Sequence, residues 1–218
     1  MEQLTAIVDS LPLLWRGFLG TLELTLLSGV GAMLVGIVVA AMRISPVPSL
    51  RVFATVYTEV LRNIPLLLVL FFCAVVLPYL QVPLDYFPLA VIGLIAYTSP
   101  FVAEAVRSGV NAVPVGQAEA ARSIGLDFGQ TLVLVVLPQA VRMVIPPLIN
   151  VFIALVKNTS VAGAFFVFEL FKSANTAVRD HGNAVVSLLL AVAVLYLVLT
   201  VALGVTAARI ERRAAVMR

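Results

Sequence analysis

The sequence predicts an all-α integral membrane protein with about five transmembrane helices. Hydrophobic residues make up 62% of the 218 residues and charged residues only 11%, whereas a soluble domain carries about 25% charged residues. Apolar runs of about 20 residues, long enough to cross a bilayer as helices, recur along the chain. The few charges are mostly grouped. This composition excludes a soluble enzyme, a nucleic-acid-binding domain and a disordered protein.

Five apolar runs form the predicted spans. The first contains small residues at helical spacing between Gly29 and Ala40, which let helices approach closely in lipid. The second carries Pro65 in its first turn, and Pro100 interrupts the third. The fifth is the most uniformly apolar. The predicted spans are residues 18–42, 61–80, 87–106, 131–156 and 184–208.

The placement of basic residues predicts how the chain is oriented in the membrane. With five spans the termini lie on opposite sides, and Lys and Arg accumulate on the cytoplasmic side. We expect the N-terminus outside and the C-terminus in the cytoplasm. The residues placed inside are then Arg43, Arg51, Arg62, Arg107, Arg122, Arg209, Arg212, Arg213 and Arg218. Those placed outside are Arg16, Lys157, Lys172 and Arg179.

The whole chain, 1–218, is predicted to be a single transmembrane domain. It shows no internal repeat. Because no basic residue precedes Arg16, we expect the first span to remain in the membrane rather than to be a cleaved signal peptide. The segment of about 107–130 is too polar to face lipid. Pro114 can start a helix there, Gly125 can end it, and Asp127 can cap the next one. A pre-formed helix and turn of this kind suit docking to a partner protein.

These residues resemble the inner-membrane permease subunits of ABC importers. The resemblance rests on Glu119-Ala120-Ala121, then Gly125, then Val135-Val136-Leu137-Pro138, at the family's spacing. Further residues are similar to the polar amino-acid branch of that family. They include Gly17, Thr21-Leu22, Leu61-Arg62-Asn63-Ile64-Pro65, Ala96-Tyr97, Ala103-Glu104, Gln117, Arg122-Ser123, Gln139-Ala140, Arg142, Pro146-Pro147, Asn150 and Leu155–Ser160.

The resemblance implies the ABC type I importer permease fold and a multi-pass protein of the bacterial inner membrane. It also implies separate ATPase subunits that bind ATP and Mg²⁺, a second permease subunit (a copy or a paralogue), and an extracytoplasmic substrate-binding protein. The chain has no Gly-x-x-x-x-Gly-Lys-Ser/Thr phosphate loop. We therefore expect it to be no enzyme and to hold no cofactor, with lipid but no nucleic acid around it. The ATPase-coupling residues implied are Gln117, Glu119, Ala120, Ala121, Arg122, Gly125 and Asp127. Glu119-Ala120-Ala121 taken alone fits an ordinary solvent-facing loop helix equally well.

Polar side chains at membrane depth are the candidates for the substrate pathway. Arg142, Pro146, Asn150, Ala154 and Lys157 form one helical stripe. A helix–helix seam, or caps at the end of the span, are the structural alternatives. For Glu104 the alternative is a pair with Arg107. The full candidate set is Tyr97, Glu104, Asn150, Lys157, Asn158, Thr159 and Ser160.

The residue type at position 158 bears on the substrate. Many relatives carry Asp at the position of Asn158, which would suit a cationic side chain. Asn158 leaves Lys157 without an adjacent carboxylate, so we expect glutamate, aspartate or glutamine rather than arginine or lysine. An ion-gradient-driven secondary transporter and a non-transporting membrane scaffold are the competing functions. No catalytic triad or metal-ligand cluster emerges from the sequence.

Overall fold

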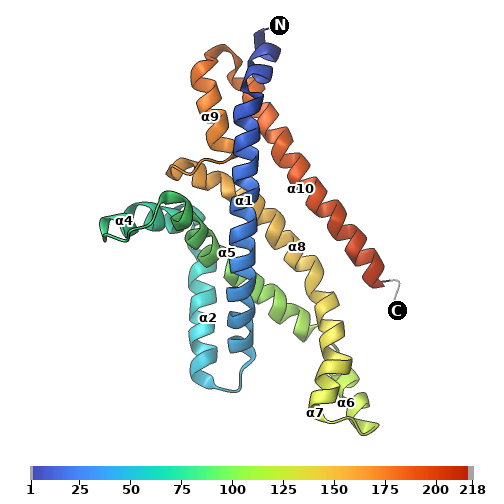
Figure 1. The fold of residues 1–218 in the computed structure, drawn as a ribbon. Helices are drawn as coiled ribbons and strands as arrows, with labels where there is room; N and C mark the ends of the chain where they lie inside the picture. The colour runs from blue at the N-terminus through green and yellow to red at the C-terminus, as the bar shows by residue number, and fades with distance from the viewer. Residues whose placement is uncertain (1, 216–218) are drawn as a thin grey trace.

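The computed structural model describes residues 2–215, and all the regular structure within that range is helical (Figure 1). Arg218, the last residue of the predicted basic tail, lies outside the described residues. Four helices are long and apolar enough to cross a membrane, and a bent helix pair raises the number to five if it counts as one span. The prediction of about five spans is therefore confirmed.

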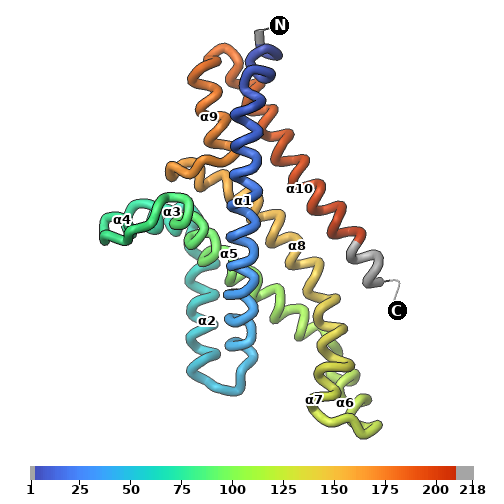
Figure 2. Tube along the Cα trace, in the orientation of Figure 1, coloured from blue at the N-terminus to red at the C-terminus, as the bar shows by residue number. Residues whose placement is uncertain are grey.

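The first helix, α1 (Glu2–Ile44), is much longer than the predicted span and begins near the N-terminus. Its added turns are stabilised by packing. Ala6 belongs to a buried cluster with Ala177 of α9 (Leu170–Asp180), and Leu14 belongs to another with Val192 of α10 (Val185–Ala215). Figure 2 shows α9 and α10 beside this first part of α1.

Helix α5 (Tyr86–Asn111) packs along α1, and the predicted small residues make the approach possible. A Cβ atom on Gly36 would lie 2.6 Å from Cβ of Val102, which no real structure tolerates without movement. Pro100 does not interrupt this helix, contrary to the prediction, because α5 continues through it to Asn111. The buried Pro100 packs inside the bundle, where neighbouring groups can accommodate the lost hydrogen bond.

The second predicted span is broken rather than straight. Helix α2 (Pro48–Asn63) ends where Ile64 turns extended, and the chain resumes after a bend of 102°. Proline disfavours helical backbone in the residue before it, so Pro65 breaks the span rather than lying in its first turn. The segment beyond the bend lies across the direction of α2 (Figure 2). It comprises α3 (Leu66–Phe71), the π-helical η1 (Phe72–Val76) and α4 (Leu77–Tyr79).

The second half of the chain begins with short helices and continues into two long ones. Helix α6 (Val115–Ser123) and α7 (Phe128–Gln130) lead into the π-helical η2 (Thr131–Val136) and then α8 (Leu137–Ala162). A 3₁₀ turn, η3 (Gly163–Phe165), and the left-handed Phe166 connect α8 to α9. Another, η4 (Gly182–Ala184), connects α9 to α10. A central apolar cluster joins Leu24, Leu70, Leu94 and Leu155 of α1, α3, α5 and α8.

Candidate functional site

Residues 114–130 form a helical projection at the end of the molecule opposite the N-terminus (Figure 1). Helix α6 begins directly after Pro114 and ends at Ser123, with Ile124 as its C-cap residue. The turn follows with Gly125 at φ +94°, a conformation that L side chains rarely adopt. The amide of Gly125 donates to the carbonyl of Arg122 at 3.1 Å, and that of Leu126 to the carbonyl of Ala121 at 3.3 Å. This is a Schellman motif, so the predicted role of Gly125 in ending the helix is confirmed.

Asp127 then starts the next helix, as predicted. Its Oδ1 accepts a 2.8 Å hydrogen bond from the amide of Gln130, and its own amide donates to Oε1 of Gln130 at 3.1 Å. This reciprocal pair is a capping box, which satisfies two backbone donors that a helix start otherwise leaves free. Local hydrogen bonds therefore hold both ends of the turn in one shape.

Most side chains of the helical projection are exposed. Six of the seven predicted coupling residues are exposed, and the exception is Ala121, which is buried against η2. Within residues 2–215, neither Glu119 nor Arg122 forms an ion pair. Ile124 and Phe128 are 80% and 74% exposed, and Val115 is similarly exposed. The sequence analysis did not select these three apolar residues as candidates for partner docking. Large apolar side chains within a polar segment were nevertheless a signal that could have indicated them.

Glu104 lies at the centre of a cluster of arginine side chains. Its two carboxylate oxygens accept hydrogen bonds from Arg107 on the same helix and from Arg43 at the end of α1. Nη1 of Arg62, at the end of α2, lies 3.8 Å from Oε2. The alternative pairing of Glu104 with Arg107 is confirmed, and the sequence missed Arg43 and Arg62 because they approach from other helices.

The α8 candidates divide between exposed and internally bonded side chains. Asn150 and Lys157 are exposed, and Asn158 is half-buried. Thr159 is buried, and its hydroxyl donates to the carbonyl of Val156 at 2.7 Å. Ser160 donates to the carbonyl of Lys157 at 2.7 Å. In the stripe itself, Arg142 is also exposed and Pro146 and Ala154 are half-buried.

Tyr97 of α5 packs against the central apolar cluster and lies 5.4 Å from Phe101, measured between ring centroids. It therefore has different neighbours from Glu104, whose partners are arginines. The structure brings the predicted coupling residues together on one projection. It does not bring Tyr97 and Glu104 together as a polar pair.

Glu169 is a buried polar residue that the sequence reading did not select. It has no exposed surface, and it accepts hydrogen bonds from the amides of Phe171 at 2.8 Å and Lys172 at 2.6 Å at the start of α9. Tyr196 of α10 donates a third at 2.7 Å. Burial raises the pKa of the Glu169 carboxyl, and these hydrogen bonds oppose that rise. The position of Glu169 directly before a helix could have predicted its capping role. The hydrogen bond from Tyr196 could not be predicted in this way, because Tyr196 is 27 residues away in the sequence.

A family model described as the binding-protein-dependent transport system inner membrane component matches residues 32–216. The chain belongs to this family. It is thus a multi-pass inner-membrane transport component, which confirms the predicted location and the resemblance to importer permeases.

Two relatives and one solved structure extend the comparison. The permease is 41% identical over 220 residues to the glutamate transport system permease protein GluC of Corynebacterium glutamicum, with 95% of this chain and 96% of the relative covered. It is 37% identical to the L-cystine transport system permease protein TcyB of Bacillus subtilis, with 93% and 86% covered. A crystal structure of an amino acid ABC transporter with histidines superposes with a TM-score of 0.90 at 30% identity, covering 96% and 97% of the two chains. The predicted importer-permease fold is confirmed.

Two cavities of the permease differ in chemistry. The first, of about 400 Å³, lies between α1, the start of α5 and the connection before α9, and it contains both Arg16 and Glu23. The guanidinium of Arg16 lies 5.6 Å from the ring centroid of Phe168, and no ion pair between Arg16 and Glu23 exists among the described residues. We call this the Arg16–Glu23 cavity.

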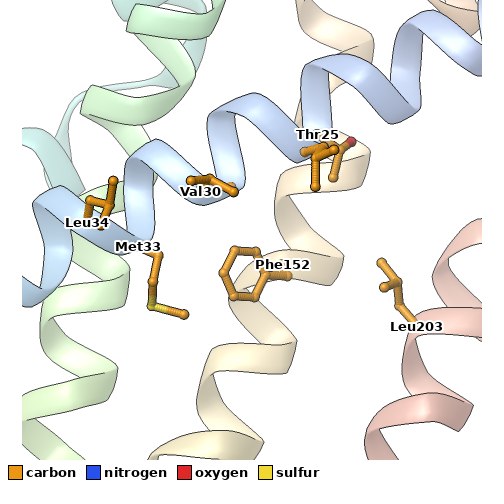
Figure 3. Close-up of a pocket in the computed structure, with 8 residues that line it drawn as sticks. Thr25, Val30, Met33, Leu34, Phe152 and Leu203 are labelled. Atoms are coloured by element: carbon orange, nitrogen blue, oxygen red, sulfur yellow. The ribbon is translucent and has the colours of Figure 1, made fainter.

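The second is an open groove of about 360 Å³ between α1, α8 and α10. In Figure 3 the side chains of Met33, Phe152 and Leu203 extend toward it from these three helices. Thr25 is the only hydroxyl-bearing residue among the eight that line it. Such a lining lacks groups that would bind an amino or carboxylate group, so it does not suit a polar amino acid. Among residues 2–215 no group of three His, Cys, Asp or Glu side chains could hold a metal ion.

Proposed function

We propose that this permease is the transmembrane subunit of an ATP-driven importer that moves polar amino acids across the cytoplasmic membrane. The helical projection is the observation that carries this proposal. Its two ends are closed by hydrogen bonds, while Glu119 and Arg122 remain exposed without an ion pair within residues 2–215. A rigid helix with free charges and exposed apolar side chains has the properties of a docking element.

The partner at the projection is proposed to be an ABC ATPase, which binds ATP and Mg²⁺ in place of this chain. Ile124 and Phe128 would enter an apolar groove on the ATPase, and Glu119 and Arg122 would pair with charges at its rim. Because the Schellman turn and the capping box fix the helix ends, movement of the ATPase would be transmitted to α8 rather than absorbed by the turn. The family description, a binding-protein-dependent transport system, agrees with an assembly of several subunits.

We propose the orientation with the N-terminus outside and the C-terminus in the cytoplasm. The helical projection and the connection between α1 and α2 lie at the end opposite the N-terminus (Figure 1). Arg43, Arg51, Arg107 and Arg122 all lie in or beside these segments. Basic residues at this end favour the cytoplasmic side, where a cytoplasmic ATPase could reach the projection.

A second permease subunit, identical or paralogous, is proposed to complete the pathway. Exposed apolar side chains such as Leu134 of η2, Val141 near the start of α8 and Leu197 on α10 offer surface for lipid or for this partner. The polar α8 residues Asn150, Lys157 and Asn158 would line the path between the subunits. At the outer end, an extracytoplasmic binding protein would release its substrate near the Arg16–Glu23 cavity, whose opposite charges match the two charged groups of an amino acid.

Glutamate, aspartate and glutamine are the proposed substrates. The glutamate transport role in the name of the 41% identical relative supports this choice, and so does Asn158 beside Lys157, which leaves a cation without an adjacent carboxylate.

Reconstitution with the cognate ATPase and binding protein tests the proposal. ATP hydrolysis and uptake would be measured across a panel of amino acids, with vesicles lacking the ATPase as the control. We expect hydrolysis to be stimulated by glutamate, aspartate or glutamine, and uptake to require the ATPase. Uptake that persists without the ATPase would support a secondary transporter instead, and no uptake under any condition would support a scaffold.

A further inference from the structure

We propose that the permease binds the phosphate group of an anionic phospholipid in a pocket between the end of α1, the start of α2 and the end of α5. The pocket has a volume of about 380 Å³. Its basic lining residues come from all three helices. It is lined by Arg43, Arg51, Val52, Thr55, Val56 and Arg107.

The charge in this pocket is unbalanced. Arg43 and Arg107 share a single carboxylate, that of Glu104. Arg51 forms no ion pair within residues 2–215 and only donates to the carbonyl of Ser45, at 3.4 Å. Three guanidinium groups line the pocket and a single carboxylate pairs with two of them, so excess positive charge remains at a partly apolar site, which an anion would offset.

The chemistry of the lining favours phosphate over other anions. Guanidinium groups bind phosphate oxygens through paired, planar hydrogen bonds. The pocket also holds Thr55, whose hydroxyl can donate a further hydrogen bond. Basic pockets between membrane helices are known to hold phospholipid head groups.

The surroundings favour a lipid over free phosphate. Val52 and Val56, one turn apart on α2, line the pocket and are 62% and 56% exposed, and Phe53 beside them is 61% exposed. A lipid phosphate bound by the arginines could lay its acyl chains along this apolar face of α2, whereas free phosphate would leave the face uncovered. The inference does not depend on the proposed substrate or ATPase, because anionic lipid contacts only this chain.

Lipid binding to the purified permease in its transporter complex tests the proposal. Native mass spectrometry would compare phosphatidylglycerol with phosphatidylcholine for the unaltered protein and for Arg51→Gln, which leaves the Glu104 ion pairs intact. We expect preferential binding of phosphatidylglycerol, weakened about fivefold in Arg51→Gln, the effect of one arginine near an anionic lipid surface. Thr55→Asp, which adds a carboxylate to the pocket, should weaken it at least as much.

Arg179→Gln is the matched control, because Arg179 is an exposed arginine on α9 at the other end of the bundle. Equal loss of lipid in Arg51→Gln and Arg179→Gln would overturn the site, as would equal binding of the two lipids. Excess inorganic phosphate separates the two phosphate sources. We expect it not to displace phosphatidylglycerol, and displacement dependent on Arg51 would overturn the assignment to lipid.

Discussion

The hydroxyl of Tyr196 donates a 2.7 Å hydrogen bond to Oε2 of Glu169, a carboxyl group with no exposed surface. The same carboxyl caps the first turn of α9. On its other side, a Cβ on Gly163 would lie 2.1 Å from Oε1, so the carboxyl fits closely against the end of α8. One side chain thus connects α8, α9 and α10 at the level where α9 packs on α1.

Tyr196→Phe is expected to lower the stability of the permease. Removing the hydroxyl takes one donor from a buried carboxyl, a change that costs about 1–3 kcal/mol. Thermal unfolding of the purified protein in detergent would measure the shift. Tyr79→Phe is the control, because Tyr79 is 87% exposed and its hydroxyl forms no hydrogen bond with the described residues. Equal unfolding temperatures for the two variants would contradict a structural role for the Tyr196 hydroxyl.

Gly125→Val is expected to uncouple ATP hydrolysis from uptake. Valine at φ +94° is strained by about 1–2 kcal/mol. The Schellman turn would therefore change shape, and α6 would no longer be held in a fixed position relative to α7. Uptake and ATP hydrolysis would be measured in the same reconstituted vesicles. Gly116→Ala is the control, since a Cβ there meets no atom within 4 Å. Wild-type uptake in Gly125→Val would rule out a coupling role for the turn.

Ile124→Ala is expected to weaken association with the ATPase while leaving the fold intact. Ile124 is 80% exposed, so its truncation should change folding stability by no more than about 0.5 kcal/mol. At the centre of an interface the same change costs more than about 1 kcal/mol, or over fivefold in Kd. Pull-down or interferometry with the ATPase would measure the affinity. Leu4→Ala removes a similarly exposed side chain at the opposite end, and an equal effect there would argue against docking at Ile124.

Arg16→Gln and Glu23→Gln are each expected to raise the amino-acid concentration needed for half-maximal uptake, by about tenfold. Each loses one charge-assisted hydrogen bond to the substrate, which contributes about 1.5–3 kcal/mol. Maximal ATP hydrolysis should stay near wild type because the helical projection is untouched. Asp9→Asn, an exposed acidic position elsewhere on α1, is the control for Glu23→Gln. Unchanged half-saturation in both cavity variants would exclude the cavity from the substrate path.

Local patterns were the features best predicted from the residues alone. The helix end at Gly125 and the helix start at Asp127 are closed by hydrogen bonds between residues at most five positions apart, so residue type and spacing were sufficient. The pair of Glu104 and Arg107 is likewise one helical turn apart. Pro65 indicated a break, but the 102° bend depends on where α3 packs, which no local pattern records.

The sequence by itself determined a helical membrane protein, the shape of the helical projection and the family. These properties follow from composition, short-range spacing and proline, glycine and aspartate chemistry. Only the tertiary structure decided that Arg43 and Arg62 join Glu104, that Tyr196 reaches Glu169, and that α1 extends past its apolar span to pack on α9 and α10. The physical reason is distance along the chain. Side chains tens of residues apart meet only when whole helices pack, and that packing is set by surfaces formed by many residues together.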